Sequence, residues 1–547
     1  MKLRELPYGN GTSFNPDKRC LPQTRVKFLD AIIDWVNNPN PFSPKVVILF
    51  GRAGTGKSSI AHEVAHWYNE MNCLTTSYFF VRGNPSGREP YRFFTTLARD
   101  LCRICPAFKA SLGRVLNDNP QLAHVRSYTT IIESLLLNPI NDSDGYFVSP
   151  ILIVIDALDE NEDAVHQRLY ANGNIIPFHA ALSRCLSRLP SNFRILITSR
   201  AETELEQEFL ESSFVCCLRM DDLELADGVD DDICTYIRSK LSGARVDETD
   251  IHELVKRAEG LFQWASVACD YIANPPPGLS STQCIRRVLF PADGNRNLNP
   301  LDALYVTVLK RFDMDDHEIH NSFRSIMGLI LSAYEPLSIV SLNAMYRHAA
   351  GVESRIQDVS VIVKHLGSLL SNVTISNSTF PISPLHTSFR DFLTDPNRSN
   401  KFYINLDDSH RQLAYAAFQV MQDILRFNIC ELETSYTLNE EISDLSDRVE
   451  KHIPWALSYS CRFWSEHLTH VSEFDAELFK SIEAFIRNKF LFWLEVLSLE
   501  GEMVVATAAL TRLRTWLGQM RGNVSILKPP CHVVGLITKT NSEQWNP

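Results

Sequence analysis

The stretch that most constrains the fold is GRAGTGKS, residues 51–58, which directly follows the apolar run VVILF of residues 46–50. It fits the pattern G-x-x-x-x-G-K-[ST] at every fixed position. Gly51, Gly54 and Gly56 let the backbone turn tightly enough for its N–H groups to face an anion. The helix expected to follow adds partial positive charge at its N-terminus. A strand, a glycine-rich loop and a helix therefore predict a phosphate-binding site.

Two side chains of this loop have specific roles in such a site. Lys57 should reach the β- and γ-phosphates of a nucleotide, and Ser58 offers a hydroxyl to Mg²⁺, which prefers oxygen ligands. The alternative is a glycine-rich turn with a lysine that binds nothing, and the strand–loop–helix context argues against it. The predicted nucleotide-binding residues of the loop are Gly51, Arg52, Ala53, Gly54, Thr55, Gly56, Lys57, Ser58 and Ser59.

An acidic cluster follows a second apolar run, ILIVID. Asp156 ends that run and is predicted, with Ser58, to be on the metal side of the site, holding Mg²⁺ through water. Asp159 and Glu160 follow closely and are predicted catalytic residues that orient or deprotonate an attacking water, in an order of roles that stays open. Alone, such a cluster is more often a solvated turn. Together with the phosphate loop, it favours a nucleotide site.

A third apolar run, FRILITS, is followed by Arg200. A guanidinium at this strand end could contact the γ-phosphate and so report whether that phosphate is present. The alternative is a solvated arginine. Its position after a third strand adds Arg200 to the predicted catalytic residues.

The wider pattern predicts an α/β fold followed by mostly α structure. Up to about residue 220, the runs VVILF, SYFFVRG, ILIVID, FRILITS and FVCCL alternate with amphipathic helical stretches. Continuous apolar strands separated by helices are typical of a parallel sheet covered on both faces. Beyond that point helical patterns dominate. The result is a nucleotide-binding α/β core with helical additions.

At 547 residues the chain is long enough for several domains. Changes of pattern predict six segments. They are a preface with one amphipathic helix (1–43), the nucleotide-binding core (44–221), a helical domain (222–298), a winged-helix-type domain (299–400), a C-terminal helical domain (401–521) and a loosely ordered tail (522–547).

Composition excludes several partners and compartments. The formal net charge is −12 and no long basic block is present, so we expect no nucleic-acid partner. No apolar leader or membrane-spanning run is evident. Thirteen scattered cysteines suit free thiols in a reducing compartment. These features together predict a cytoplasmic protein without a membrane span.

The motifs together resemble the NACHT family of signal-transducing P-loop NTPases, part of the STAND class to which animal and plant intracellular immune receptors also belong. The likeness is strongest to the fungal branch and covers most of residues 20–500. The segments that carry it, beyond the phosphate loop, are CLPQTRVKFLDAIIDW, DALDE, AEGLFQWASVACDYI, LDALYVTVL, EPLSIVSL and PLHTSFRDFL, and more loosely CRFWSEHL and KFLFWLEVLSL.

This resemblance implies a five-stranded parallel core, a helical lid at 222–298, and a winged helix that folds back over the nucleotide. In the family a winged-helix histidine contacts the β-phosphate of ADP and locks the closed form. His386, in SPLHTSF, occupies the matching motif. The implied cofactors are ATP or ADP, with GTP as an alternative, and Mg²⁺.

The implied function is a switch that is closed with ADP, open with ATP and hydrolyses nucleotide slowly. It would serve intracellular signalling such as fungal innate immunity or non-self recognition, with self-association on activation and unidentified effector or sensor protein partners. The chain departs from many relatives because only a short segment precedes the core and no repeat of 20–50 residues is evident. The signal and the output therefore stay open.

Two other functions remain as alternatives. A winged helix between Ser338 and Ser371 could read DNA, although its candidate helices offer only Arg347, Arg355 and Lys364 for phosphate contacts. A small-molecule kinase would use the same phosphate loop, although no acceptor pocket is obvious in the helical remainder.

Overall fold

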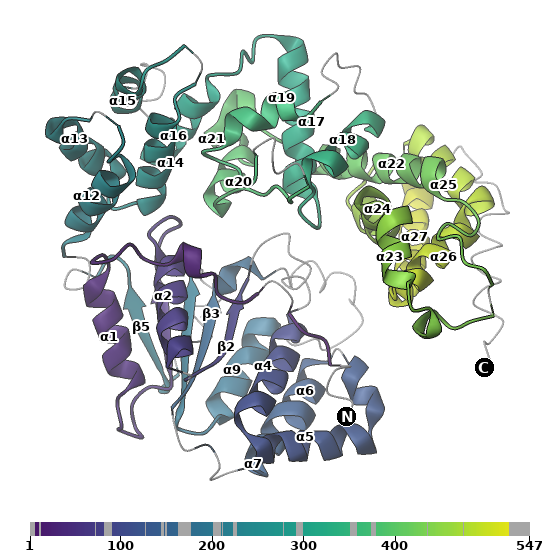
Figure 1. The fold of residues 1–547 in the computed structure, drawn as a ribbon, viewed down its shortest axis with the longest axis horizontal. Coiled ribbons are helices and arrows are strands. Elements are labelled where there is room, and N and C mark those ends of the chain that lie inside the picture. Colours follow the sequence, from purple (N-terminus) through teal and green to yellow (C-terminus); the bar gives the residue numbers. More distant parts are fainter. Residues whose placement is uncertain are drawn as a thin grey trace. The chain divides into compact units, whose positions relative to one another are not determined.

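The computed structural model divides into two compact units, Met1–Val308 and Leu309–Pro547, each described here by itself (Figure 1). The predicted loose tail lies outside the described residues, except for residues 522 and 523. The structure describes residues 6–9, 12–71, 73–80, 90–125, 127–143, 147, 150–161, 177–200, 209, 212–222, 227–244, 246–276, 278–290, 299–349, 358–373, 379–434, 436–473 and 475–523.

A five-stranded parallel sheet forms the centre of the first unit, in the order β2-β3-β4-β1-β5 (Figure 1). Its inner strands are buried along their whole length, as expected for a sheet covered on both faces. The predicted fold class is confirmed. The strands are β1 Val46–Phe50, β2 Leu74–Phe79, β3 Ile151–Asp156, β4 Phe193–Ser199 and β5 Val215–Arg219.

Helices cover the sheet in two layers, and alternate residues of each strand face one layer or the other. In β1, Val47 and Leu49 pack in the core with α1 and α2, whereas Val46, Ile48 and Phe50 pack in the opposite core. The first core is built by α1 Val26–Val36 and α2 Lys57–Glu70, and the second mainly by α4 Tyr91–Ile104, α5 Pro106–Asp118, α6 Tyr128–Ile131, α7 Asn138–Asn141 and α9 Phe178–Arg188.

The predicted preface is built into this unit. The N–H of Phe79 in β2 donates to the carbonyl of Thr12, 2.8 Å away, and the N–H of Asn15 donates to Nδ1 of His62 in α2 at 3.0 Å. These contacts fix the course of the chain into α1, whose first residue follows Arg25. The helical region after the sheet comprises α12 Val229–Lys240, α13 Glu248–Ala258, α14 Phe262–Ala273, α15 Ser281–Leu289 and α16 Pro300–Leu309.

The second unit is helical in its described residues apart from two isolated antiparallel bridges, Ser338–Pro381 and Leu370–Pro384. The predicted β segment VTIS lies outside the described residues except for Val373, so the winged helix stays a prediction. The helices are α17 His317–Ser332, α18 Ile339–His348, α19 Ser360–Val363, α20 Thr387–Leu393, α21 Pro396–Ser399, α22 Leu406–Ile424, α23 Leu445–His452, α24 Trp455–Leu468, α25 Ala476–Asn488, α26 Phe490–Leu499 and α27 Met503–Asn523.

Large aromatic side chains fill the core of this second unit. Trp464, Trp493 and Trp516 are all almost fully buried. At its edge, Arg462 of α24 makes two hydrogen bonds to the carboxylate of Glu335, at 2.5 and 2.6 Å. Searched over the described parts of the chain, no helix has the length and apolar character needed to cross a membrane.

Candidate functional site

The phosphate loop joins the carboxyl end of β1 to the N-terminus of α2. Gly54 and Gly56 have φ angles of +83° and +92°, a region that side-chain-bearing residues rarely adopt. A Cβ on Gly54 would also lie only 2.7 Å from Cβ of Gln263. Because α2 begins at Lys57, the unpaired N–H groups of its first turn follow directly on the loop. The predicted strand–loop–helix context is therefore present.

Lys57 lies inside the loop and is only 9% exposed. Its ammonium group donates hydrogen bonds to the carbonyls of Gly51, at 2.7 Å, and Arg52, at 2.9 Å. Burial lowers the pKa of Lys57 to about 8, although the nearby charges of Asp159 and Asp156 act in the opposite direction. Contact with an anionic phosphate would raise that pKa again.

Asp156 ends β3 and is 4% exposed. Burial raises its pKa, against hydrogen bonds from Thr198 and Ser58 and the charge of Lys57. The hydroxyl of Ser58 and the carboxylate of Asp156 are thus in direct contact. Two adjacent oxygen ligands, one of them acidic and both beside a phosphate loop, fit the ligand preferences of Mg²⁺.

Asp159 and Arg200 are brought together at the end of β4. The side-chain oxygen Oδ1 of Asp159 accepts a hydrogen bond from the backbone N–H of Arg200 at 3.0 Å, and Oδ2 lies 3.1 Å from Nε of the same arginine. The side chain of Asp159 is 3% exposed and that of Arg200 25%. Glu160 is buried beside them, and its charge acts on Lys57.

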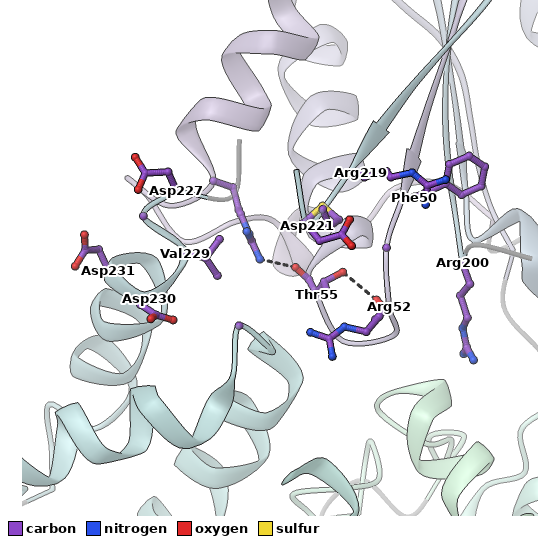
Figure 2. A pocket seen from close by; sticks show the side chains of 15 residues that line it. Phe50, Arg52, Thr55, Arg200, Arg219, Asp221, Asp227, Val229, Asp230 and Asp231 are labelled. Carbon is purple, nitrogen blue, oxygen red and sulfur yellow. Dashed lines mark hydrogen bonds between the residues drawn. The ribbon is translucent and has the colours of Figure 1, made fainter. Parts of the chain in front are cut away.

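A cavity of about 670 Å³ opens beside the loop. Figure 2 shows Arg52, Thr55 and Arg200 around it, with Asp230 and Asp231 of α12 across from them. Its volume is within the range of small-molecule and cofactor sites. Three of the predicted loop residues, Gly51, Arg52 and Thr55, therefore border a space of nucleotide size together with Arg200.

Arg25 also lines this cavity, and sequence reasoning gave it no role. It is 4% exposed, its Nη2 donates to the carbonyl of Thr55 at 2.6 Å, and its guanidinium lies 4.7 Å from the ring centroid of Phe262. Nε and Nη1 are buried without a hydrogen-bond partner. The sequence signal was the Thr-Arg pair before α1, but its partners are distant in the chain and could not be read from spacing.

His386 lies in the second unit, where it forms the N-cap of α20. Its Nδ1 accepts a hydrogen bond from the backbone N–H of Ser388 at 3.0 Å and lies 2.6 Å from the hydroxyl of that serine. The predicted contact of His386 with a nucleotide stays a prediction.

Comparison with known proteins gives two sequence matches. Residues 25–200 match the family described as Nephrocystin 3, N-terminal. Over 298 residues the chain is 25% identical to the vegetative incompatibility protein HET-E-1 of Podospora anserina. That alignment covers 50% of this chain and 20% of HET-E-1, so this chain corresponds to about a fifth of that relative.

Two solved structures show a more distant likeness. A Signal Transduction ATPase with Numerous Domains (STAND) protein with a tetratricopeptide repeat sensor, from Pyrococcus horikoshii, matches over 93% of this chain and 65% of its own, with 11% identity and a TM-score of 0.36. PCH-2 of C. elegans matches over 53% of this chain and 70% of its own, with 11% identity and a TM-score of 0.26. Neither score supports a detailed superposition.

The parallel sheet with its phosphate loop and acidic strand end defines the P-loop NTPase fold. The sequence matches support the resemblance to the fungal NACHT type of STAND protein.

Proposed function

We propose that this protein is a nucleotide-dependent switch, closed with ADP and open with ATP, that hydrolyses nucleotide slowly. The observation that carries the proposal is the convergence of Lys57, the Ser58–Asp156 pair and the Asp159–Arg200 pair on one phosphate loop. A loop with only a structural role would not require two buried carboxylates, a buried lysine and an arginine at the ends of adjacent strands.

The phosphate half of the site follows from these contacts. Lys57 would bind β- and γ-phosphate oxygens in place of the carbonyls of Gly51 and Arg52. Ser58 and Asp156 would hold Mg²⁺, which when bound neutralises charge on the phosphates. Arg200 would contact the γ-phosphate and so distinguish ATP from ADP.

The nucleoside half would lie in the cavity beyond the loop. There the unpaired Nε and Nη1 of Arg25 are donors that base or sugar acceptors could satisfy. Both adenine and guanine carry such acceptors, so ATP and GTP remain alternatives.

His386 would act as the histidine lock that the family resemblance implies. Because its Nδ1 accepts the hydrogen bond from Ser388, a neutral ring carries its proton on Nε2. That N–H would be the donor to a β-phosphate oxygen in the proposed contact with ADP.

A switch of this kind requires that its open and closed forms bind a given nucleotide with different affinities. Moving an equilibrium from 1:99 to 99:1 takes about 5.5 kcal/mol, which contacts to one γ-phosphate and Mg²⁺ could supply. Self-association on activation, and effector or sensor partners in cytoplasmic signalling, belong to the same proposal. The name of HET-E-1 points to fungal non-self recognition as the setting.

The test is to release and identify the nucleotide carried by freshly purified protein. We expect ADP with the native chain and with Lys109→Ala, which removes an exposed lysine of the same unit, and none with Lys57→Ala. Circular dichroism establishes that Lys57→Ala is folded, and Lys57→Met, which keeps the length of the side chain without its charge, serves if it is not. An empty native protein that is not stabilised by millimolar ATP or ADP would overturn the proposal.

A further inference from the structure

One edge of the sheet is covered by a segment near the N-terminus rather than by a strand. In the order of the described strands β2 lies at one end, so β3 pairs with only one of its edges (Figure 1). The N-terminal strap, which we define as residues 6–9 and 12–15, lies along the other edge. The N–H of Phe79 donates to the carbonyl of Thr12 at 2.8 Å, and the N–H of Phe14 donates to the hydroxyl of Ser77 at 3.1 Å. The strap therefore runs antiparallel to β2.

Side chains of the helices on both faces of the sheet hold the strap in place. The N–H of Gly9 donates to the hydroxyl of Thr96 in α4 at 2.9 Å, and the N–H of Asn15 donates to Nδ1 of His62 in α2 at 3.0 Å. Among the described residues, only the bond from Phe79 joins the backbone of β2 to that of the strap. The cover of this edge is thus a separate segment and not a sixth strand of the sheet.

The deepest anchor of the strap is Asp100 of α4, which is 5% exposed. Its Oδ1 accepts from the hydroxyl of Tyr8 at 3.1 Å, and its Oδ2 accepts from the hydroxyl of Thr76 in β2 at 2.6 Å. Burial raises the pKa of Asp100, against the hydrogen bonds from Thr76 and Tyr8. Without the strap this buried carboxylate loses one of its donors, so an uncovered edge is unfavourable.

The edge fits this strap better than an arbitrary extended segment. Leu6 is 1% exposed and packs in the core that contains α4. At Gly9 a Cβ would lie only 2.6 Å from Cε2 of Tyr78. The edge therefore selects an apolar residue, a tyrosine and a glycine at the positions of Leu6, Tyr8 and Gly9. The segment that meets these requirements is the strap itself, from the same copy or from a second copy of this chain.

A mostly exposed linker joins the strap to α1. Residues 16–19 and 22–23 of this linker are exposed. Gln23 has φ of +70°, a left-handed conformation that costs free energy in a residue with a side chain. Opening of the linker would relieve that cost without disturbing the core. A well-anchored segment on an exposed and strained linker is the arrangement that permits exchange between copies.

We propose that two copies of this chain exchange their straps, so that each strap covers the β2 edge of the other copy. The strap makes the same contacts in the closed monomer and in the exchanged dimer. The balance between them depends on the linker and on the effective concentration of the strap near its own edge. This exchange would provide the self-association in the proposed function, and the proposal rests on that part of it alone.

The test is a disulfide cross-link between two copies. Phe14→Cys is introduced in one copy and Ser77→Cys in another of different mass, because these two positions adjoin each other where the strap meets β2. The copies are mixed at high concentration, incubated, oxidised mildly and separated under denaturing conditions without reductant. We expect a cross-linked dimer with one chain of each kind, and peptide mapping should place the bond between positions 14 and 77. Each variant mixed with the native chain gives the background from the native cysteines.

A chain with both substitutions is the positive control, and it should form the cross-link within itself. Dimers formed through any other surface would not bring positions 14 and 77 of different copies together. If the double variant forms no internal cross-link, Phe14 is instead replaced with the photo-cross-linker benzoylphenylalanine. Its products with a copy of different mass are then mapped.

Tyr8→Phe tests whether the strap must leave Asp100 before it is exchanged. The hydrogen bond to Asp100 is lost equally in the monomer and in the dimer, so the final yield of mixed cross-link should not change. The rate of its formation should rise about fivefold, the effect of one hydrogen bond. The matched control is Tyr436→Phe, which removes the hydroxyl of a tyrosine that is 96% exposed. It should change neither the yield nor the rate.

The proposal is overturned if the double variant cross-links within one chain but the mixed copies do not, because the strap is then a fixed cover. A mixed cross-link whose rate is the same in Tyr8→Phe would also overturn it. Either result leaves nucleotide binding by the phosphate loop standing. Absence of nucleotide binding, which is measured separately, would remove the switch but not the exchange of straps.

Discussion

The backbone N–H of Gln263 donates a hydrogen bond to the carbonyl oxygen of Gly54, 3.0 Å away. This bond joins the phosphate loop to the N-terminus of α14, in the helical region that follows the sheet. Phe262, the preceding residue, lies against the guanidinium of Arg25. A rearrangement of the loop on nucleotide binding would therefore act directly on α14.

Replacing each of three glycines with alanine should separate the cost of a positive φ from the cost of a clash with a neighbouring side chain. Gly54→Ala meets both a positive φ and the side chain of Gln263, whereas Gly228→Ala meets only a positive φ and Gly243→Ala meets neither. We expect Gly228→Ala to lower the free energy of unfolding by about 1–2 kcal/mol, since its left-handed backbone disfavours a Cβ. Gly54→Ala should cost more and also weaken nucleotide binding.

Chemical denaturation and ATP titration measure these effects. Gly243→Ala is the reference and should change the unfolding free energy by no more than about 0.5 kcal/mol. Equal stability and equal ATP affinity for all three variants would contradict the role of crowding at the loop.

The affinity for ADP should depend on pH through Lys57. Its pKa in the free protein is about 8, and a bound phosphate raises it, so above pH 8 binding requires uptake of a proton. We expect the affinity for ADP to change little with pH just below pH 8. Above pH 8 it should fall by up to about tenfold for each pH unit. Calorimetry in buffers of different ionisation enthalpy counts the proton taken up.

Lys57→Arg is the control for this pH dependence, because a guanidinium stays charged throughout this range. The slope above pH 8 should then disappear, whatever the absolute affinity. A native protein whose affinity is constant from pH 7.5 to 9.5 would show that Lys57 is fully charged before nucleotide binds.

Arg25→Met should weaken ATP and ADP by the same factor. Methionine keeps a long side chain beside Phe262 but removes the unpaired guanidinium donors of a residue that lines the cavity. Because the nucleoside is common to both ligands, we expect about a tenfold loss for each, the size of one or two hydrogen bonds. Equilibrium titration with each nucleotide is the measurement, and a selective loss of ATP would contradict this assignment.

Glu335→Ala should destabilise the second unit by about 3 kcal/mol, because it leaves Arg462 buried without its partner. The unfolding of this unit can be followed by fluorescence, since three of its tryptophans are buried. Glu477→Ala breaks an exposed pair with Lys480 and should cost less than about 0.5 kcal/mol. A similar loss for both variants would rule out burial as the cause.

The parts of this fold that depend on local pattern could be predicted from sequence. The five strands follow from continuous apolar runs, and the loop from its glycines and their flanks. β2 begins at Leu74, before the apolar part of its run, because pairing with β3 rather than apolarity sets its start. Strand order also depends on contacts between distant segments and is not encoded in any one run.

In the site, too, the residues marked by a local sequence pattern could be predicted, whereas the contacts between distant segments could not. Asp156, Asp159 and Arg200 could be chosen because each ends or follows a buried strand. That Asp159 meets the end of β4 could not be predicted, because the contact depends on the turn after β3, where Ala157 has a left-handed backbone.

The place of β1 between β4 and β5 has a consequence for biosynthesis. β1 ends at residue 50, but the partners on its two sides begin at residues 193 and 215. At ordinary translation rates β1 therefore waits on the order of ten seconds on the ribosome before either neighbour has been made. During that interval its apolar faces and unpaired edges need shielding, and chaperones that bind nascent chains would be required most at this stage.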